Sequence, residues 1–418
     1  RGSDRRGFQG EPPDETEIAG AASSLSLRTQ VGIVGAGPAG LFLARLLRRA
    51  GIDHVIIEAR SRDYIDARVR AGVLEEITVN LMRDLCIDGR MRREGMVDHF
   101  LDIRFEGRRI HLDLPALAGG KQVMIYGQQE IVKDLVAAQL ADGGPLFFEA
   151  DAVAIEGLDG ARPTIRYRQD GAEATLECDL VAGCDGFHGV CRGAIPEALL
   201  TTYDHIFPFA WLGILSESPP IEDMTYCNHD RGFALFSRRS PRVSRLYLQC
   251  TAEENLDEWP DARIWDELHI RLGDTARSEL QEGRIFQRGV AALRSFVAAP
   301  MQYGPLYLAG DAAHIVPPTG AKGLNLAVAD IQVLARAMIE FLRTGNRDRL
   351  DRYSDVCLRR VWKTVRYSTF MTNLLHRFDT HTPFERQIQL TELDYILGSR
   401  AAQTAIAESY IGLPLEMD

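Results

Sequence analysis

The chain has 418 residues, of which 45% are hydrophobic and 26% charged, and its formal net charge is −11. This composition is that of a globular protein with a sizeable core, and the acidic balance argues against a nucleic-acid partner. A small anionic substrate remains compatible, because a local cluster of arginines can reverse the field inside a pocket. No apolar run reaches the roughly 18 residues of a membrane span and no signal peptide is apparent, so we expect a cytoplasmic protein without a membrane partner.

The seven cysteines are scattered without a Cys-x-x-Cys pair, and the ten histidines show no metal-ligand spacing. We therefore expect free thiols in a reducing compartment and no metal site. Residues 1–28 are polar and rich in Gly, Pro, Ser and charge, so they are expected to form a disordered leader outside the fold.

The fold is expected to begin with the parts of a dinucleotide fingerprint: strand, glycine-rich turn, helix, second strand and acid. The first strand is 29–34, the turn is Gly35-x-Gly37-x-x-Gly40 and the helix is 41–50. The second strand is 54–57, and the acid after it is Glu58. Gly35 makes the tight turn, Gly37 lets a pyrophosphate approach the backbone, and Gly40 lets the helix pack on the sheet. Glu58 is expected to hold ribose hydroxyls. These residues alone leave FAD and NAD open as the ligand.

Arg68 and Arg70 follow the second strand, and for each of them a phosphate contact and a solvated surface position are both open. Alternating residues then predict a hairpin over 100–114, a helix over 127–140 and strand pairs over 147–155 and 164–177. Later strands end at Asp185 and Asp311, as the earlier one ends at Glu58. Ligands of open α/β sheets bind at such carboxyl ends.

The pattern changes from about 203 to 290, where strands rich in aromatic residues precede a polar helix over 262–271. We interpret this segment as an inserted antiparallel sheet that binds substrate. After Asp311 a stiff loop with Pro317 and Pro318 leads into a helix from about Leu324 to Leu342. Helices are also predicted over 350–375 and 383–407, and 410–414 is expected to be an extended tail.

Three motifs in this order, GAGPAG at 35, CDGFHGVCR at 184 and GDAAHIVPPTGAKGLNLA at 310, resemble the aromatic-ring hydroxylases of the single-component flavoprotein monooxygenases. Segments 225–249 and 408–414 resemble the members of this group that act on 4-hydroxybenzoate. The resemblance covers 29–413. It implies a mixed α/β fold in which a Rossmann-like FAD-binding domain carries an inserted antiparallel-sheet domain and a C-terminal helical region. The expected parts are the leader 1–28, the FAD-binding domain 29–202 with β insertions around 100–125, the substrate domain 203–290, the second FAD-binding part 291–345 and the helical dimerisation region 346–418.

The resemblance also implies which residues contact FAD. Asp311 is expected to reach the ribityl chain and the pyrophosphate, while the loop after Pro318 and the start of the following helix lie against the flavin ring. The full set of expected FAD contacts is Gly35, Gly37, Gly40, Glu58, Arg68, Arg70, Gln128, Asp185, Arg245, Asp311, Gly323, Leu324 and Asn325.

For the substrate, the resemblance makes Arg239 the carboxylate clamp, helped by Ser237 and Tyr247. A guanidinium fork suits a planar carboxylate. Tyr226 and Tyr410 are expected to form a proton relay at the phenol, beside the Pro318 carbonyl. The implied reaction converts 4-hydroxybenzoate to 3,4-dihydroxybenzoate with NAD(P)H and O2, through a flavin C4a-hydroperoxide, in a homodimer.

Two positions depart from the pattern of the group. Relatives often carry a His at the outer end of the proton relay, whereas this chain has Asp98 with His99 beside it, and either residue could substitute. Arginines after Glu58 favour NADPH, with NADH still open, because some NADPH-using relatives carry Arg where Ala59 stands. Contacts to the nicotinamide coenzyme are expected from Arg60, Tyr64, His188 and Arg294.

Alternatives from the same and from another class stay open. One is a hydroxylase of a related acid, 3,4-dihydroxybenzoate or 4-aminobenzoate. The other is a non-catalytic binder on the same fold, as in the GDP-dissociation inhibitors. Such a binder would not need both the Asp311 loop and the set of Arg239, Tyr226 and Tyr410.

Overall fold

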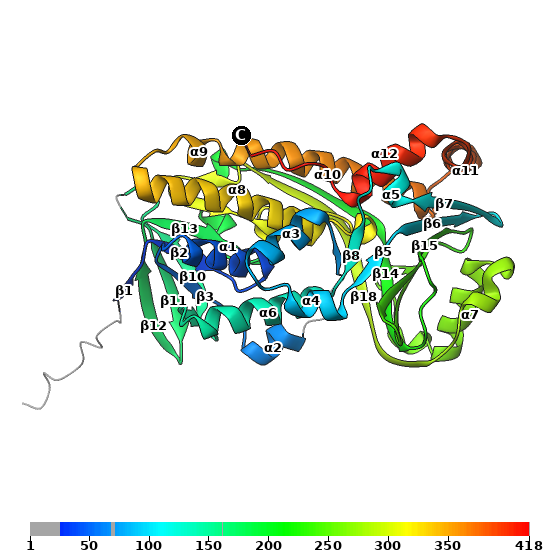
Figure 1. Ribbon diagram of the computed structural model, residues 1–418, viewed down its shortest axis with the longest axis horizontal. Coiled ribbons are helices and arrows are strands. Elements are labelled where there is room, and N and C mark those ends of the chain that lie inside the picture. The colour runs from blue at the N-terminus through cyan, green and yellow to red at the C-terminus, as the bar shows by residue number, and fades with distance from the viewer. Residues whose placement is uncertain (1–25, 68–71, 161, 418) are drawn as a thin grey trace, which may run out of the picture.

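The structure, a computed structural model, describes residues 26–67, 72–160 and 162–417. Two large sheets dominate it, and they follow one another along the long axis of the molecule (Figure 1). The first carries the dinucleotide turn, and the second reaches to the opposite end, where α7 (Asp261–Leu272) packs. None of the helices within the described ranges is long and apolar enough to cross a membrane.

The first large sheet has six strands in the order β19-β20-β13-β2-β3-β9. These strands are β19 (Gln302–Tyr303), β20 (Leu306–Leu308), β13 (Leu180–Gly183), β2 (Val31–Val34), β3 (His54–Ile57) and β9 (Leu146–Phe147). All neighbours pair in parallel except β19 and β20. Every residue of β2, β3, β13 and β20 is buried, as expected for parallel strands covered on both faces. The predicted Rossmann-like sheet is therefore confirmed.

Helices cover this sheet. Helix α8 (Gly323–Thr344) lies between α1 (Pro38–Arg49) and α10 (Tyr353–Leu375) and contacts both (Figure 1). Its buried residues, such as Leu326, Leu334 and Met338, recur at helical spacing, which is why the sequence predicted it well. The other helices around this sheet are α2 (Arg62–Ala67), α3 (Glu76–Asp84), α4 (Gly89–Glu94), α6 (Gln128–Ala141) and α9 (Asp348–Asp351).

A four-stranded sheet in the order β1-β12-β11-β10 lies beside the first one. It contains β10 (Asp151–Glu156), β11 (Thr164–Gln169), β12 (Ala172–Glu177) and β1 (Ser26–Arg28). The predicted leader was expected to extend to residue 28, but Ser26–Arg28 pairs in parallel with β12 and belongs to the fold. Its three residues are too short to give a periodic signal.

The second large sheet has eight strands in the order β21-β18-β14-β17-β16-β15-β6-β7. These are β21 (His314–Ile315), β18 (Arg284–Ala299), β14 (Thr201–Glu217), β17 (Val243–Cys250), β16 (Ala234–Ser240), β15 (Met224–Asn228), β6 (Phe100–Phe105) and β7 (Arg108–Asp113). The predicted hairpin over 100–114 is present, with Glu106 and Gly107 at positive φ in its turn. It joins the sheet because β6 pairs in parallel with β15, so the sheet is mixed and not wholly antiparallel.

This sheet crosses the expected domain boundaries. Strand β14 begins before residue 203, and β18 runs through residue 290 to Ala299. Strand β21, which follows the Asp311 turn, pairs with β18. The two large sheets are thus joined at the loop that is expected to meet the cofactor. A small sheet of β4 (Val73–Leu74), β8 (Val123–Ile125) and β5 (Met96–Asp98) bridges them as well.

The C-terminal region is helical, as predicted, and consists of α10, α11 (Pro383–Gly398) and α12 (Arg400–Ile411). A capping box of Thr382 and Glu385 starts α11, and Ser399 caps α12. The prediction that Tyr410 lies in an extended tail is wrong, because α12 continues to Ile411 and ends only at Gly412, whose φ is +110°. One face of the eight-stranded sheet packs on α10–α12 and the other on α7.

Candidate active site

The dinucleotide turn has the predicted shape. Gly35 follows β2 with φ +103°, where a Cβ would overlap the backbone of Cys184. A Cβ on Gly40 would overlap the carbonyl oxygen of Gly35, whereas one on Gly37 would meet nothing within 4 Å. Glu58, directly after β3, accepts from the Ala36 amide at 2.7 Å. The space above Gly37 is therefore open for a phosphate group at the start of α1.

These two glycines allow a matched prediction. Gly40→Ala should destabilise the fold itself by roughly 3 kcal/mol, because backbone blocks its Cβ. Gly37→Ala should leave the melting temperature of the FAD-free protein unchanged but weaken FAD binding at least tenfold, since the new methyl would occupy the open space. Thermal unfolding and FAD titration of both variants check this. Equal FAD affinity in wild type and Gly37→Ala would contradict it.

The three acids predicted at strand ends lie at one edge of the parallel sheet. Glu58 follows β3, Asp185 follows β13 and Asp311 follows β20, and these strands are neighbours or next neighbours of β2. Asp185 accepts from the Cys191 amide at 2.9 Å, but its Oδ1 is buried and has no partner among the described residues. Burial raises the pKa of Asp185, although the Cys191 amide opposes this. An orphaned carboxylate oxygen of this kind fits a ligand hydroxyl or amide.

The Asp311 loop joins β20 to α8. Gly310 has φ +63°, and the chain then makes two short turns, η5 (Gly310–Ala312) and η6 (Pro318–Gly320). No side chain caps the N-terminus of α8, so the first amides of this 22-residue helix, from Gly323 on, are available to negative charge. The Asn325 side chain is not: it accepts from the Glu75 amide and the Thr78 hydroxyl and donates to the Val73 carbonyl. Asn325 could therefore meet a cofactor through its backbone and not through its side chain.

The other expected FAD contacts are placed as follows. Gln128 is the first residue of α6, with Gly127 before it. Arg245 lies on β17, where its Nε donates to the Tyr247 hydroxyl and its Nη1 is buried without a partner among the described residues. Arg68 and Arg70 lie outside the described residues.

Strand register brings the expected substrate residues to one face of the eight-stranded sheet. Tyr226 on β15 is opposite Leu235 on β16, which is opposite Tyr247 on β17. Ser237 is opposite Arg245, and its hydroxyl donates to the Arg245 carbonyl at 2.8 Å. Because residues two apart share a face, these side chains point to the same side. This is the face that packs toward α10–α12.

Arg239 lies in a β-bulge of β16, where the register shifts between Arg238 and Ser240. A bulge turns a side chain away from the regular direction. The Arg239 guanidinium lies against the backbone of Gly127, which has no side chain to obstruct it. It makes no hydrogen bond or ion pair with the described residues, and burial together with nearby Arg245 lowers its pKa. A half-buried guanidinium that is not paired with a carboxylate fits an anionic ligand.

The two tyrosines meet at the end of this face. The Tyr226 hydroxyl donates to the Thr319 carbonyl at 2.8 Å, next to Pro318. The Tyr410 hydroxyl interacts with the Tyr226 hydroxyl and with Met224 Sδ at 2.8 Å. Burial raises the pKa of both tyrosines, so both hydroxyls are protonated at neutral pH. Tyr226, Tyr410 and the Pro318 turn, which come from distant parts of the chain, are thus brought together.

Asp98 and His99 differ sharply in surroundings. Asp98 is 2% exposed and accepts from the Arg238 guanidinium at 2.9 Å, whereas His99 is exposed. Burial raises the pKa of Asp98 to about 6, against the opposing charge of Arg238. The Asp98 charge in turn contributes to the raised pKa of Tyr226 and of Tyr410. Of the two candidates, Asp98 is therefore the one near the tyrosines.

The residues expected to meet the nicotinamide coenzyme form two groups. Arg60 lies over the Tyr64 ring at 5.2 Å, after β3. Exposed His188 follows Phe187, and Arg294 on β18 lies over the Phe187 ring at 4.4 Å while it pairs with Asp204 at 2.5 Å. A coenzyme phosphate at Arg294 would have to share it with Asp204.

One buried charged group was missed from the sequence. Lys322 is 4% exposed and donates to the Glu75 carboxylate at 2.8 Å and to the Tyr410 carbonyl at 2.5 Å, while Arg360 pairs with the other Glu75 oxygen at 3.1 Å. This network ties the loop before α8 to the end of α12. The signal was a single lysine among small residues in the segment TGAKG, which could have indicated a buried amine.

A different cluster has the distances of a metal site. Asp102, His111 and Asp223 offer ligand atoms within 4.8 Å of one another. The Arg109 guanidinium contacts Asp102 at 2.6 Å, His111 at 3.1 Å and Asp223 at 3.3 Å. Because an arginine already supplies the positive charge there, we infer no metal from this cluster.

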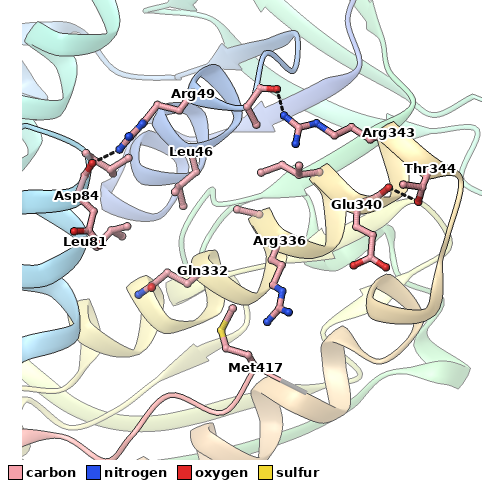
Figure 2. Close-up of a pocket in the computed structure, with 14 residues that line it drawn as sticks. Leu46, Arg49, Leu81, Asp84, Gln332, Arg336, Glu340, Arg343, Thr344 and Met417 are labelled. Carbon is pink, nitrogen blue, oxygen red and sulfur yellow. Dashed lines mark hydrogen bonds between the residues drawn. The ribbon is translucent and has the colours of Figure 1, made fainter.

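A hollow of about 780 Å³ lies apart from all these residues, between α1, α3 and α8 (Figure 2). Leu46, Leu81 and Met417 line it, and Arg49 and Arg343 at its edge donate to the carbonyls of Asp84 and Ala50. No residue predicted from the sequence to bind a ligand lies among those that line it.

Comparison with known proteins agrees with the geometry. Residues 28–368 match the model of the FAD binding domain family. The chain is 46% identical over 393 residues to the p-hydroxybenzoate hydroxylase of Acinetobacter baylyi, which covers 94% of this chain and 97% of the relative. It is 27% identical over 352 residues to the 6-methylpretetramide 4-monooxygenase of Streptomyces rimosus, with 81% of each chain covered.

Solved structures agree at the level of the fold. The p-nitrophenol 4-monooxygenase of Pseudomonas putida superposes with a TM-score of 0.78 at 19% identity, over 93% of this chain and 99% of that one. An aklavinone-11 hydroxylase in complex with FAD and aklavinone gives a TM-score of 0.70 at 20% identity, over 83% and 69% of the two chains.

Proposed function

The chain belongs to the family of FAD-dependent aromatic monooxygenases, and from this premise we propose that it hydroxylates 4-hydroxybenzoate to 3,4-dihydroxybenzoate with NADPH and O2. The observation that carries the proposal is Arg239: a half-buried guanidinium that makes no hydrogen bond or ion pair with the described residues, in the bulge of β16 two residues after Ser237. The relative at 46% identity, named p-hydroxybenzoate hydroxylase, supports the choice of substrate.

In the proposed complex Arg239 binds the substrate carboxylate through its fork, and the hydroxyls of Ser237 and Tyr247 complete the lone pairs. The phenol end lies toward Tyr226 and the Pro318 carbonyl. This orientation puts the charged end of the substrate at the cation and the apolar ring over Leu235 and its neighbours. Catalysis by positioning of this kind requires that the substrate bind in one orientation only.

FAD fits the residues that are present. Open space at Gly37, the acceptor Glu58, the orphaned oxygen of Asp185 and the uncapped N-terminus of α8 suit its pyrophosphate, ribose and ring. When bound, FAD supplies the redox chemistry that activates O2. The chain would hold it with Asp311 and the backbone from Gly323 to Asn325, and the aromatic lining would keep water from the reacting ring.

The role proposed for Tyr226 is to accept the phenolic proton on its hydroxyl oxygen while it gives up its own proton, because a phenolate is a far stronger nucleophile than a phenol. The proton that Tyr226 gives up passes to the hydroxyl of Tyr410, which in turn gives up its own proton toward the outer end of the relay. Asp98 is the proposed acceptor at the outer end, since it is buried near both tyrosines while His99 is exposed.

This assignment predicts a pH profile. With a pKa of about 6, Asp98 is ionised above that pH and can accept a proton, and it loses this capacity as the pH falls through about 6. The hydroxylation rate of the wild type should fall over the same interval. Asp98→Asn should lower the hydroxylation rate at neutral pH by roughly 100-fold and abolish its fall with decreasing pH. Single-turnover hydroxylation between about pH 5 and 8 measures this. The control variant His99→Gln should keep the fall in rate at low pH. If the rate of His99→Gln no longer depends on pH, His99 and not Asp98 is the proton acceptor.

NADPH is the proposed donor, with NADH as a weaker substitute. Arg60 after Glu58, stacked on Tyr64, supports recognition of an additional phosphate, and His188 and Arg294 are proposed as contacts to the nicotinamide half. The coenzyme would bind only transiently, since the chain contains a single glycine-rich fingerprint.

We also propose a homodimer in the cytoplasm. On α11, Phe384, Ile388 and Tyr395 are 73%, 54% and 60% exposed, and their spacing puts them on one helix face that a second copy would cover. A monomeric sedimentation mass would contradict the dimer.

The cytoplasmic location is a separate part of the proposal. All seven cysteines are free thiols, which supports a reducing compartment.

A direct test of binding uses the flavin as reporter. The purified protein should be yellow, and 4-hydroxybenzoate should shift its visible absorption spectrum with saturation. A colourless protein that cannot be reconstituted with FAD would favour a binder without redox function. A flavoprotein whose spectrum ignores 4-hydroxybenzoate but responds to another benzoate would transfer the proposal to that acid.

A further inference from the structure

A buried ion pair lies directly beneath the Asp311 turn and has no place in the chemistry described above. His314 on β21 and Asp330 on α8 are 2% and 1% exposed, and His314 Nε2 is 2.6 Å from Asp330 Oδ2. The same carboxylate oxygen accepts from the Gly310 amide at 3.1 Å. One carboxylate thus holds both ends of the five-residue segment 310–314, with Asp311 inside it.

The segment needs such support because its backbone is unusual. Gly310 has φ +63°, and its position is confined by Ala39 of α1 and Ala327 of α8. The Ala313 amide returns to the Gly310 carbonyl at 2.9 Å, and Arg192 donates to the Ala312 carbonyl at 2.9 Å. These bonds set the internal shape of the turn. The side chain of Asp330 ties the turn to the helix whose N-terminus is proposed to face the flavin.

We propose that the His314–Asp330 pair is a positioning device that fixes Asp311 and the start of α8 relative to each other, and thereby sets the affinity for FAD. The inference rests on the proposed placement of FAD at Asp311. Since both elements meet the cofactor, loosening their connection costs affinity without removing any group that touches FAD. His314 and Asp330 are therefore positioning residues and not catalytic ones.

The charge state of His314 supports this role. Burial opposes the imidazolium, but the charge and hydrogen bond of Asp330, together with the charge of Asp311, outweigh it and raise the pKa of His314. The other titratable groups near the pair are Cys184, beyond β13, and Tyr353 and Cys357 on α10, whose pKa values burial raises, so they stay neutral. Arg192, on the other side of the turn, stays charged.

The sign of the pH dependence follows. The positive charge that holds His314 to Asp330 is fully present below the ordinary histidine pKa of about 6.5. The charge, and with it the stabilisation of the pair, is lost as the pH rises through the raised pKa. FAD affinity of the wild type should therefore fall on the alkaline side. The FAD affinity of His314→Gln should not show this alkaline fall. Titration of FAD itself affects the pH profiles of wild type and variant equally, so it cancels in the ratio of their affinities.

The experiment measures the dissociation constant of FAD with FAD-free protein by fluorescence quenching. Asp330→Asn and His314→Gln should each raise this constant about tenfold or more, which is the effect of one charge-assisted hydrogen bond. The dissociation constant of the double variant should not exceed the larger of the two single-variant constants. His205→Gln and Asp355→Asn, at exposed positions on β14 and α10, are matched controls and should bind FAD as the wild type does. Melting of the FAD-free proteins separates affinity from general stability.

Asp311→Asn is the reference variant. If it weakens FAD binding while Asp330→Asn and His314→Gln bind FAD as tightly as the wild type, the positioning role is overturned. If Asp311→Asn itself has no effect, the placement of FAD fails and the inference fails with it. Should the pair variants not fold, the wild-type profile decides: a loss of FAD affinity below the pH at which free FAD itself titrates supports the pair, and a flat profile over that range overturns it.

Discussion

Arg239→Ala should raise the KM for 4-hydroxybenzoate at least about 30-fold while the protein keeps its FAD. Removing one partner of a desolvated, hydrogen-bonded charge pair costs about 2 kcal/mol or more, and each 1.4 kcal/mol is a factor of ten. The loss should be large because no other cation is as well placed: Arg238 pairs with Asp98, and Arg245 donates to Tyr247. Steady-state kinetics with a fixed NADPH concentration measures it.

Three controls make this result specific. Arg239→Lys should recover only part of the affinity, because an ammonium keeps the charge but lacks the fork. Arg242→Ala, an exposed arginine on the turn after β16, should leave the KM unchanged. 4-Hydroxybenzamide, which lacks the carboxylate charge, should bind wild type and Arg239→Ala about equally well. An unchanged KM for 4-hydroxybenzoate in Arg239→Ala would remove the clamp assignment.

Tyr226→Phe should uncouple the enzyme. The variant keeps the ring that packs against Phe233 but loses the hydroxyl that meets Tyr410 and the Thr319 carbonyl. Loss of a proton acceptor typically costs 10²- to 10⁴-fold, so we expect hydroxylation to slow by roughly 100-fold. NADPH and O2 would then be consumed with release of H2O2 in place of hydroxylated product. The ratio of 3,4-dihydroxybenzoate formed to NADPH oxidised measures the effect.

A second buried tyrosine provides the matched control. Tyr307 on β20 is fully buried in the parallel sheet, outside the group formed by Tyr226, Tyr410 and Asp98. Tyr307→Phe should therefore keep complete coupling. If Tyr226→Phe is also fully coupled, the proton leaves by another route and the relay of Tyr226, Tyr410 and Asp98 is wrong.

Local patterns predicted the local parts of the fold. The Gly35 turn, the hairpin at Glu106–Gly107 and helix α8 each depend on residues close in sequence, and each lies where it was expected. The predicted end of α12 was too early. Gly412 and Pro414 led to the prediction that Tyr410 is already extended, whereas the helix continues to Ile411 and ends at Gly412.

What the sequence could not predict depends on distant pairing. Nothing near residues 100–105 indicates that β6 pairs in parallel with β15, some 120 residues later, yet this pairing puts the hairpin beside Tyr226. Lys322 and Glu75 are 247 residues apart. The bulge that turns Arg239 and the exposure difference between Asp98 and His99 likewise follow from packing and not from residue type.

The most direct test of the central claim is turnover of the purified, FAD-loaded protein with a panel of para-substituted benzoates and with NADPH or NADH. We predict that 4-hydroxybenzoate gives 3,4-dihydroxybenzoate in near-equal amount to the NADPH consumed, and that NADH supports the reaction less well. 3,4-Dihydroxybenzoate and 4-aminobenzoate should turn over slowly or release H2O2. Coupled hydroxylation of one of these acids, with only H2O2 from 4-hydroxybenzoate, would contradict the proposal.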